Sequence, residues 1–352
     1  MAITLKDVAR EAGVGTTTAS LVLRGNPHPM ISAGTRERVL DAARRLKYRH
    51  NSHARQLRLG RSEAVGILAW VLAQGMSLAK FQAIERAIHA RGYRTLVGHA
   101  DEDEEALVRF AKEFVSGAME GAILLNLERG YRDALEVLVG RGIPVVSLEL
   151  LEGVPVDVVT VDRRAGAYLA TKHLLELGHR RIAILHPAPT FPLAHERLEG
   201  YRDALAEHGL AVDTSLLVAN VGSSRNGSYG QGYETAQRLL AIRPLPTAVF
   251  CSNDEIAIGV MKALGEAGVR VPDDTAVVGF DDMPVAAYLP VPLTTIAQPV
   301  EEQAAQAVAL LFDRIENPDR ERPPQAIRLK PRLVVRASCG AAAAGRERRA
   351  DS

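Results

Sequence analysis

The chain has 352 residues, and 47% of them are hydrophobic, so it is long enough for two or three domains with substantial cores. Its N-terminus lacks the apolar segment of a secretion signal, and no run of about 18 apolar residues is present to span a membrane. The net charge of +1 conceals an uneven distribution, because residues 1–62 carry 12 Lys and Arg against 4 Asp and Glu, whereas residues 63–352 carry 31 against 38.

Three short helices are predicted near the N-terminus. The first contains an apolar stripe with helical spacing, formed by Leu5, Val8, Ala9 and Ala12. Thr4 is placed to cap it, Gly13 to end it, and a second helix is expected from about Thr16 to Arg24. A third opens at Ser32. Two short helices joined by a tight glycine turn are typical of a helix-turn-helix, although a three-helix bundle with no nucleic-acid role has the same spacing.

The basic charge of residues 1–62 favours the nucleic-acid interpretation, since a phosphate backbone attracts such a region. Four blocks follow in order: T-L-K-D-V-A-R-E-A-G-V, T-x-S-x-V-L, I-S-x-x-T-R-E-R-V and N-x-x-A-R-x-L-R-x-G. Together they resemble the DNA-binding head of the LacI/GalR (lactose-repressor) family of transcriptional regulators. The resemblance implies a helix-turn-helix domain over 1–49, a hinge helix and linker over 50–62, and binding to a palindromic operator as a homodimer.

The resemblance also implies that Leu57 wedges into the minor groove, with Ala54 allowing a close approach. An apolar wedge unstacks a base step and bends the duplex. An ordinary leucine packed between domains is the alternative for Leu57. Gly15 and Leu21 replace the serine and the polar or basic residue that the family commonly has, so we expect a divergent operator. The candidate DNA-contacting residues are Thr4, Thr16, Thr17, Thr18, Ser20, Leu21, Arg24, Asn51, Ala54, Arg55, Leu57 and Arg58.

From Ser62 onward, short apolar runs alternate with helix-length amphipathic segments, which predicts parallel sheets built from βαβ units. The predicted strands are 65–69, 94–98, 122–125, 145–148, 158–161, 181–185, 216–220, 248–251 and 276–280. The predicted helices are 78–90, 107–115, 131–140, 165–177, 198–208, 233–240 and 254–266. So many strands exceed one comfortable sheet, and we therefore expect an α/β region of two lobes.

Further blocks extend the family resemblance along the chain, among them R-L-E-G-Y, C-S-N-D-E-I-A-I-G, V-V-G-F-D-D and P-L-T-T-I. They resemble the two-lobed, periplasmic-binding-protein-like (type I) sensor of that family. The resemblance implies an effector-binding domain over 63–337 whose chain crosses between lobes near Val161, Ile296 and Pro324. Lobe 1 would hold 63–161 and 297–323, and lobe 2 would hold 162–296 and 324–337. The small and charged residues of 338–352 are expected to be a disordered tail.

Polar residues follow several predicted strands, at the edge where parallel sheets bind ligands. Glu149, Asp162, Asn253 and Asp281 are in this position, and Arg197 opens a helix that should face the same cleft. By resemblance Arg197, Asn253 and Asp281 hold the effector, commonly a sugar. The alternative for Asp162 and Asn253 is helix capping.

The first cleft loop departs from the Asp-x-x-Asn-Pro-Phe-Phe run of many family members and reads V-L-A-Q-G-M-S. Gln74 and Met76 from this loop complete the candidate effector set with Trp70. Trp70 either replaces the missing aromatic stacking face or packs at the rim of a lobe. Sugars, nucleosides, sugar phosphates and other small polar metabolites therefore remain open as effectors.

The leading hypothesis is a ligand-responsive, DNA-binding regulator, most simply a repressor, that acts in the cytoplasm and associates with the bacterial nucleoid when bound to its operator. A non-enzymatic solute-binding protein, whose head has lost specific DNA binding, is the alternative. An α/β enzyme is disfavoured, since G-x-G-x-x-G after a strand, G-x-x-x-x-G-K-[ST] and G-x-S-x-G are all absent. Cys251 and Cys339 are far apart, which favours free thiols, and no cofactor, metal or membrane partner is expected.

Overall fold

A computed structural model describes most of the chain in two compact units, Met1–Ser62 and Glu63–Ser352, called here the head and the sensor. The described residues are 3–23, 31–48, 62–70, 72, 75–101, 103–117, 119–126, 131–151, 153–187, 194–221, 227–320 and 322–341. Within these ranges no helix combines the length and apolar character needed to cross a membrane.

The head contains the three predicted helices, α1 (Leu5–Glu11), α2 (Thr16–Leu23) and α3 (Ala33–Arg45). Thr4 caps α1 in a capping box with Asp7, and Ser32 caps α3. Gly13 has a φ of 66°, a left-handed conformation that lets the chain turn sharply between α1 and α2. The apolar faces of the helices meet in one small core, formed by Val8, Ala9, Ala12, Ala19, Val22, Val39, Ala42 and Ala43. The helix-turn-helix prediction is therefore confirmed.

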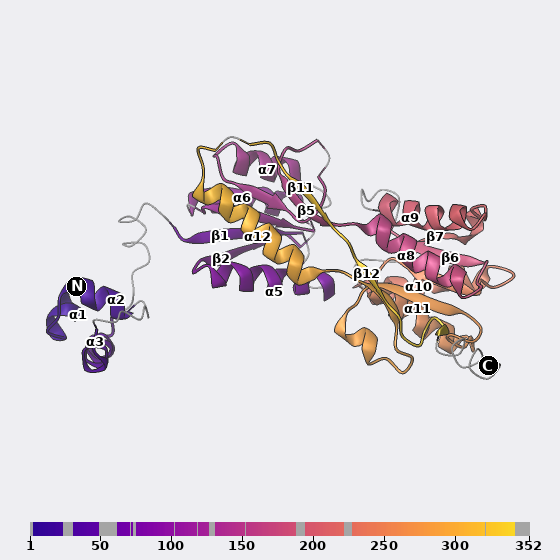
Figure 1. Cartoon of the computed structure of the whole chain (residues 1–352), viewed down its shortest axis with the longest axis horizontal. Helices are drawn as coiled ribbons and strands as arrows, with labels where there is room; N and C mark the ends of the chain where they lie inside the picture. The colour runs from indigo at the N-terminus through magenta and orange to yellow at the C-terminus, as the bar shows by residue number, and fades with distance from the viewer. Residues whose placement is uncertain are drawn as a thin grey trace. The chain divides into compact units, whose positions relative to one another are not determined.

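The sensor contains two six-stranded sheets, one in each lobe (Figure 1). The strand order in lobe 1 is β11-β5-β4-β3-β1-β2, and its strands are β1 (Ala64–Ala69), β2 (Arg94–His99), β3 (Gly121–Leu125), β4 (Val145–Ser147), β5 (Asp157–Val161) and β11 (Ala326–Leu329). The order in lobe 2 is β12-β10-β9-β8-β6-β7, and its strands are β6 (Ile182–His186), β7 (Leu217–Ala219), β8 (Ala248–Cys251), β9 (Ala276–Asp281), β10 (Thr294–Ala297) and β12 (Arg332–Val334). Only β12 runs antiparallel to its neighbour among these pairings.

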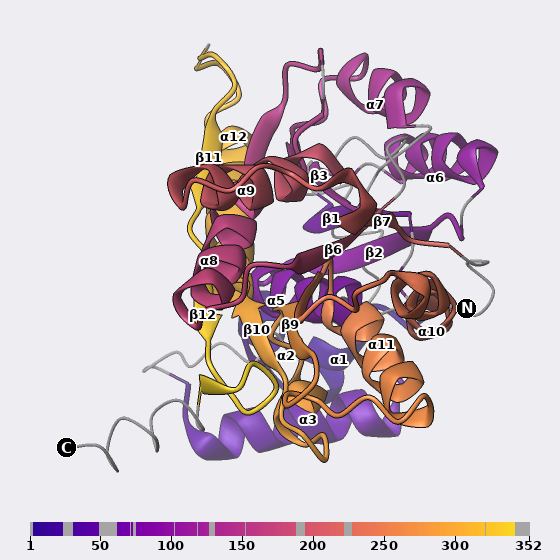
Figure 2. The ribbon, with the colours of Figure 1, turned by 90° about the vertical axis from the view of Figure 1, so that its right-hand side faces the viewer.

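Helices cover both faces of each sheet, which gives each lobe three layers (Figure 2). In lobe 1, α5 (Gly75–Ala90) and α12 (Val300–Glu316) cover one face, and α6 (Glu104–Ser116) and α7 (Tyr131–Val139) cover the other. In lobe 2, α8 (Arg163–Glu176) and α9 (Ala194–Glu207) lie opposite α10 (Gly227–Ala241) and α11 (Asp254–Glu266). Two short 3-10 turns, Thr214–Leu216 and Pro284–Ala287, complete lobe 2.

The helix α12 was not among the predicted elements, although its buried residues recur at helical spacing. Ala304, Ala307, Val308 and Leu311 are all buried against lobe 1. The apolar run of β1, which was predicted, lies in the middle of the same core. A helix therefore closes one face of lobe 1 even though it follows the strands of lobe 2 in the sequence.

The third crossing between the lobes does not lie where the sequence predicted it. We expected it near Pro324, with 324–337 in lobe 2. Instead β11 pairs in parallel with β5 of lobe 1, from Ala326 against Val158 to Leu329 against Val161. The main-chain hydrogen bonds of this pairing hold β11 in lobe 1, and the crossing falls between Leu329 and Arg332.

The predicted start of the disordered tail, at residue 338, is also too early. Ser338 is fully buried, its hydroxyl donates to the Val277 carbonyl at 2.6 Å, and the Thr294 amide donates to that hydroxyl at 2.8 Å. Cys339 is buried in the core of lobe 2. Residues 338–341 are thus part of the packed lobe, because they satisfy buried polar groups of β9 and β10. Residues 342–352 lie outside the described residues.

Glycines allow the helices α10 and α11 to pack closely. A Cβ on Gly259 of α11 would collide with the carbonyl oxygen of Tyr229 and would lie 2.7 Å from the Tyr233 amide nitrogen. Backbone atoms cannot move aside as a flexible side chain can. The exposed Gly265, on the same helix, has no atom within 4 Å of such a Cβ.

We therefore predict that Gly259→Ala lowers the free energy of unfolding of the sensor by about 1–3 kcal/mol, the usual cost of overpacking. Gly265→Ala is the matched control and should raise it by up to about 1 kcal/mol, since alanine is the better helix former. Thermal unfolding followed by circular dichroism measures both. Equal effects of the two substitutions would contradict the close helix contact.

Candidate effector site and DNA-binding head

One face of α2 in the head is left exposed. Ala19 and Val22 are buried in the core of the head, and Thr16 and Thr17 are exposed on the other side. Thr18, Ser20 and Leu21 are partly exposed. A helix with short polar side chains on a free face has the shape that enters a major groove.

Thr4 has a definite local role in the head. Its hydroxyl donates to the Asp7 carboxylate at 2.7 Å and accepts from the Asp7 amide at 3.4 Å. These hydrogen bonds lower the pKa of Asp7. Thr4 therefore caps α1, as predicted, and a DNA contact would come in addition to this cap.

In the sensor, a buried charge cluster joins the two lobes. Lys80 of α5 and Glu149 after β4 belong to lobe 1, and Arg163 opens α8 of lobe 2; all three are at most 4% exposed. Lys80 Nζ lies 3.4 Å from Glu149 Oε1, and the Arg163 guanidinium donates to Glu149 Oε2. Burial opposes ionisation of Glu149, but Arg163 and Lys80 outweigh it and hold the carboxyl pKa below its usual value.

The cluster continues onto the helix α9 and the end of β9. Arg163 lies 3.7 Å from Glu196, and the neighbouring Arg197 stacks 4.5 Å above the buried ring of Phe280. Burial, together with the nearby Arg163, lowers the pKa of Arg197 to about 10. Its Nε is buried and has no hydrogen-bond partner in the described structure. Arg197 thus keeps hydrogen-bonding capacity for a bound molecule.

Two adjacent strands of lobe 2 end in further polar groups. Asp281, the last residue of β9, accepts a hydrogen bond from Gln298 Nε2 at 2.5 Å. Burial raises the pKa of Asp281 to about 6, although Arg197 opposes the shift. Asp254, at the start of α11, is fully buried, and burial raises its pKa to about 8, with the neighbouring Asp281 adding to the effect. The Met283 amide and the Thr295 hydroxyl both donate to it, at 2.8 and 2.5 Å.

Glu255 makes a second contact between the lobes. Its carboxylate accepts hydrogen bonds from the Ser228 side chain and from the backbone N–H of Gly75, the first residue of α5 in lobe 1. Burial raises its pKa above the ordinary value. A Cβ on Gly75 would lie 2.7 Å from Met283 Sδ, so the flexible side chain of Met283 in lobe 2 packs directly against the start of α5.

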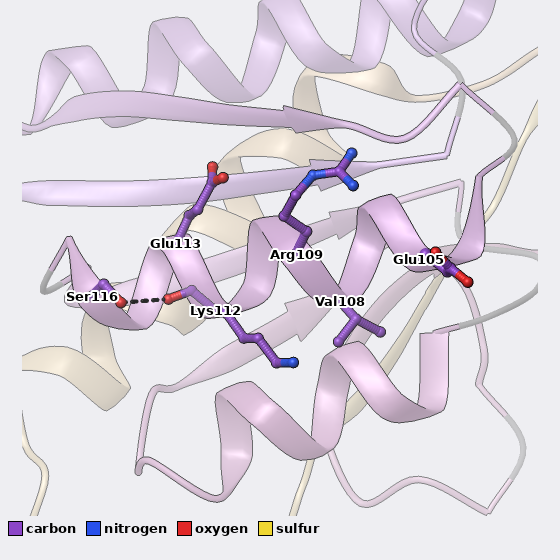
Figure 3. A pocket seen from close by; sticks show the side chains of 6 residues that line it. All are labelled: Glu105, Val108, Arg109, Lys112, Glu113 and Ser116. Carbon is purple, nitrogen blue, oxygen red and sulfur yellow. Dashed lines mark hydrogen bonds between the residues drawn. The ribbon is translucent and has the colours of Figure 1, made fainter.

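A separate hollow of about 600 Å³ lies on the outer surface of lobe 1 (Figure 3). All of its lining residues belong to α6, and none of the predicted effector residues is among them: Glu105, Val108, Arg109, Lys112, Glu113 and Ser116. In the part of the chain that the structure describes, no three His, Cys, Asp or Glu side chains are grouped to hold a metal ion. The interlobe cluster is therefore the better candidate for binding a small molecule.

Residues 4–51 match the family described as bacterial regulatory proteins, lacI family, and residues 171–339 match a periplasmic binding protein-like domain. The HTH-type transcriptional repressor PurR of Pasteurella multocida (strain Pm70) is 32% identical over 337 residues, which cover 95% of this chain and 98% of that protein. The chain belongs to the LacI family. The family resemblance of the sequence blocks is thereby confirmed.

Solved structures of LacI-family proteins agree with this conclusion. The lac repressor dimer bound to operator and the anti-inducer ONPF has a TM-score of 0.77 and 27% identity, covering 96% of this chain and 99% of that chain. The complex of the transcriptional regulator CelR with cellobiose has a TM-score of 0.71 and 30% identity, with the same coverage. The chain is therefore a ligand-responsive, DNA-binding transcriptional regulator and not an enzyme, and the two-lobed fold prediction is confirmed.

Several predicted effector residues of this LacI-family sensor lie in the interlobe cluster. Glu149, Arg197 and Asp281 are linked there with Lys80 and Arg163. Asp162 and Asn253 instead cap helices: Asp162 Oδ1 accepts from the Ala165 amide at 2.9 Å, and Asn253 Oδ1 accepts from the Ile256 amide at 2.7 Å. The capping that the sequence left open for these two residues is therefore present, and an effector contact would use their remaining capacity.

Trp70 and Met76 are both partly buried in lobe 1. Trp70 packs against the core beneath α6 and α7, and its contact with an effector stays a prediction. Met76 is partly buried in the first turn of α5. Gln74, and the DNA-contact candidates Arg24, Asn51, Ala54, Arg55, Leu57 and Arg58, lie outside the described residues.

Sequence reasoning missed two cations of the cluster, Lys80 and Arg163, and three of its carboxyls, Glu196, Asp254 and Glu255. Lys80, Arg163 and Glu255 each sit in a helix, where a charged residue ordinarily faces solvent. The apolar spacing of α5 did carry a signal, because Lys80 falls four residues before the buried Ile84. Such a position predicts burial, and a buried lysine requires a partner.

We predict that Glu149→Gln destabilises the sensor by about 3–5 kcal/mol, because it leaves Lys80 and Arg163 buried without their counter-charge. The exposed Glu301, which pairs with Arg86, is the control, and Glu301→Gln should cost at most about 1 kcal/mol. Thermal unfolding at neutral pH compares the two. Since the folded-state pKa of Glu149 is lowered, its stabilising contribution is present above about pH 4.5 and is lost as pH falls further. Similar losses from both substitutions at pH 7 would contradict the assignment.

Proposed function

We propose that this LacI-family protein is a repressor that binds a palindromic operator as a homodimer, and that a small polar effector of the sugar type, held between the lobes, controls it. The observation that carries the proposal is the buried charged cluster that spans the lobes through Lys80, Glu149 and Arg163. A molecule bound beside these groups contacts both lobes at once. The protein would act in the cytoplasm, on the nucleoid whenever it occupies its operator.

The position and chemistry of the cluster support a polar effector. Asp281 stands at the carboxyl end of its strand and Glu149 just beyond β4, where ligands bind in parallel α/β sheets. Arg197 and Asp281 offer a donor and an acceptor that a hydroxyl group can satisfy together. The cellobiose complex of CelR supports a sugar as the class of effector. Asp162, Asn253, Trp70, Gln74 and Met76 remain proposed contacts.

The head supports a DNA partner. Its exposed α2 face, with Thr16 and Thr17 foremost, would read base edges, and its surplus of positive charge would bind phosphates. The operator-bound lac repressor dimer supports both the DNA partner and the dimeric state. Leu57 and Ala54 would form the minor-groove wedge.

Control passes along the chain from the sensor to the head. Residues 50–62 precede β1, an interior strand of the lobe 1 sheet, so a movement of lobe 1 would reach the head through the backbone. An effector that favours one lobe arrangement changes operator affinity by its differential binding, ordinarily about 1–3 kcal/mol. The coupling is reciprocal, and operator changes effector affinity by the same factor.

Selection from a random pool of duplexes tests the proposal, with the purified full chain at moderate salt and no added metabolite. We expect an enriched palindrome with a flexible central step, because a dimer reads two half-sites and a wedge needs a step that unstacks. Enrichment of a single, non-repeated half-site would contradict the dimeric reader. The selected duplex then serves to screen sugars by the change that each causes in operator affinity.

We predict that Leu57→Ala lowers affinity for the selected operator by at least about tenfold, while affinity for non-specific DNA at the same salt is unchanged. The wedge acts only at a deformable specific step, and the phosphate contacts remain. Leu40→Ala, in an exposed leucine of α3, is the control and should leave both affinities unchanged. Fluorescence anisotropy measures them. Unchanged specific affinity in Leu57→Ala would eliminate the wedge.

A further inference from the structure

The interlobe cluster contains more carboxyl groups than basic groups. Among the described residues its cations are Lys80, Arg163 and Arg197, and its carboxyls are Glu149, Glu196, Asp254, Glu255 and Asp281. Arg328, 47% exposed on its side chain and 3.4 Å from Glu196, adds a solvent-screened fourth basic group, so five carboxyls face four basic groups. Each of these carboxyls is electrostatically linked to another member of the cluster.

Two of the three buried cations already have carboxylate partners. Lys80 and Arg163 share Glu149, and Arg163 also lies near Glu196. Arg197 alone has no ion pair within 4 Å in the described structure, but Asp281, Glu149 and Glu196 all act on it electrostatically. An anion that approached Arg197 would therefore enter a region that carboxylates already dominate, and desolvation there makes repulsion strong.

The raised pKa values of three carboxyls agree with the excess of carboxyl groups over basic groups in the cluster. Burial raises the pKa of Asp281 to about 6 and that of Asp254 to about 8, and it raises the pKa of Glu255 as well. These carboxyls lack enough compensating positive charge in the ligand-free protein. A positive or proton-donating group placed next to them would supply it.

Buried side-chain atoms without a hydrogen-bond partner are also mainly acceptors. Among the described residues of α9 and those just after β7 and β10 they are Glu196 Oε2, Asn220 Oδ1 and Gln298 Oε1, against one donor, Arg197 Nε. Asn220 follows β7 and Gln298 follows β10, so two of these acceptors lie at the carboxyl edge of the lobe 2 sheet. Unpaired buried acceptors select a ligand that donates hydrogen bonds to them.

We propose that the effector is uncharged or cationic and rich in hydrogen-bond donors, such as a polyol or an amino-substituted polyol, and that the cleft rejects phosphate esters and carboxylates. This inference rests on the proposed function, because it concerns the same interlobe site. It removes sugar phosphates from the set of effectors that the sequence left open. Asp281 is the residue that we expect to discriminate most directly, since it acts electrostatically on Arg197, the buried cation without an ion pair.

The first test needs no ligand. Asp281→Asn keeps an oxygen that can accept from Gln298 and removes one negative charge. We expect its thermal midpoint, relative to that of the wild-type full chain, to rise as pH increases from 5 to 8, by at least about 2 °C. The sign follows from the raised pKa: above about pH 6 the wild-type carboxyl is ionised in a site that disfavours the charge, whereas asparagine is neutral throughout.

Asp157→Asn is the matched control for this measurement. Asp157 is as buried as Asp281 but receives two hydrogen bonds from Arg314, at 2.7 and 2.8 Å, outside the cluster. Its substitution should lower the midpoint at pH 8. If Asp281→Asn lowers the midpoint at pH 8 as much as Asp157→Asn does, the surplus of negative charge does not exist and the inference is overturned.

The second test compares glucose, glucosamine and glucose 6-phosphate as probes on one scaffold, by thermal shift of the full chain at pH 7.5 and constant ionic strength. We expect glucose 6-phosphate to raise the midpoint of the wild type no more than sodium chloride does. The double variant Asp281→Asn, Glu255→Gln should gain a shift with glucose 6-phosphate. Its three buried cations then outnumber the two carboxylates that remain ionised, Glu149 and Glu196, because Asp254, with a pKa of about 8, is mostly protonated at pH 7.5.

A shift of the wild type by glucose 6-phosphate that disappears in Arg197→Met would overturn the inference. Both tests are independent of DNA. A chain that enriches no operator but shows the expected charge behaviour would contradict the proposed function and leave the ligand class intact. An enriched operator, together with a glucose 6-phosphate shift of the wild type that disappears in Arg197→Met, would contradict the ligand class and leave the proposed function intact.

Discussion

Glu149 is the residue on which the arrangement of the sensor depends most. Its carboxylate is buried between a lysine of α5 and the arginine that opens α8, so it connects lobe 1 to the first segment of lobe 2. Removing three charged groups from water costs several kcal/mol for each ion, and only close pairing offsets that cost. The ion pairs of Glu149 therefore hold the crossing from β5 into α8 in place. The same contacts form part of the proposed effector site.

The interactions inside each lobe differ from those in the layer between the lobes. Their cores are mainly apolar, and in lobe 2 glycines such as Gly232 and Gly259 bring helices into backbone contact. The layer between the lobes is ionic and hydrogen-bonded, with Glu255 reaching the first amide of α5. Polar interfaces between rigid bodies permit relative motion more readily than apolar ones. A regulator needs this combination, because effector binding must move whole lobes without deforming them.

Much of the fold could be predicted from the sequence, because its local signals agree with the final structure. The glycine turn of the head, the alternating strands and helices, and the polar residues after strands are all local patterns. The third crossing could not be placed, since Ala326–Leu329 can extend equally well beside either sheet and only pairing with β5 decides. Asp162 and Asn253 show a further limit: a residue between a strand and a helix has the chemistry for both capping and ligand binding.

The backbone at the end of β9 shows how the cleft is prepared before any effector arrives. Asp281 has a φ of 128° and Asp282 a φ of 59°, conformations that residues with side chains rarely adopt and that cost free energy. The strain is held from both sides, by Arg336, which donates to Asp282 at 2.6 Å, and by Asp254, which accepts from the amide of Met283. Gln298 then fixes the Asp281 carboxyl itself. Because the fold has already met this cost, the effector need not order the group that recognises it, and more of its binding free energy is available to shift the lobes.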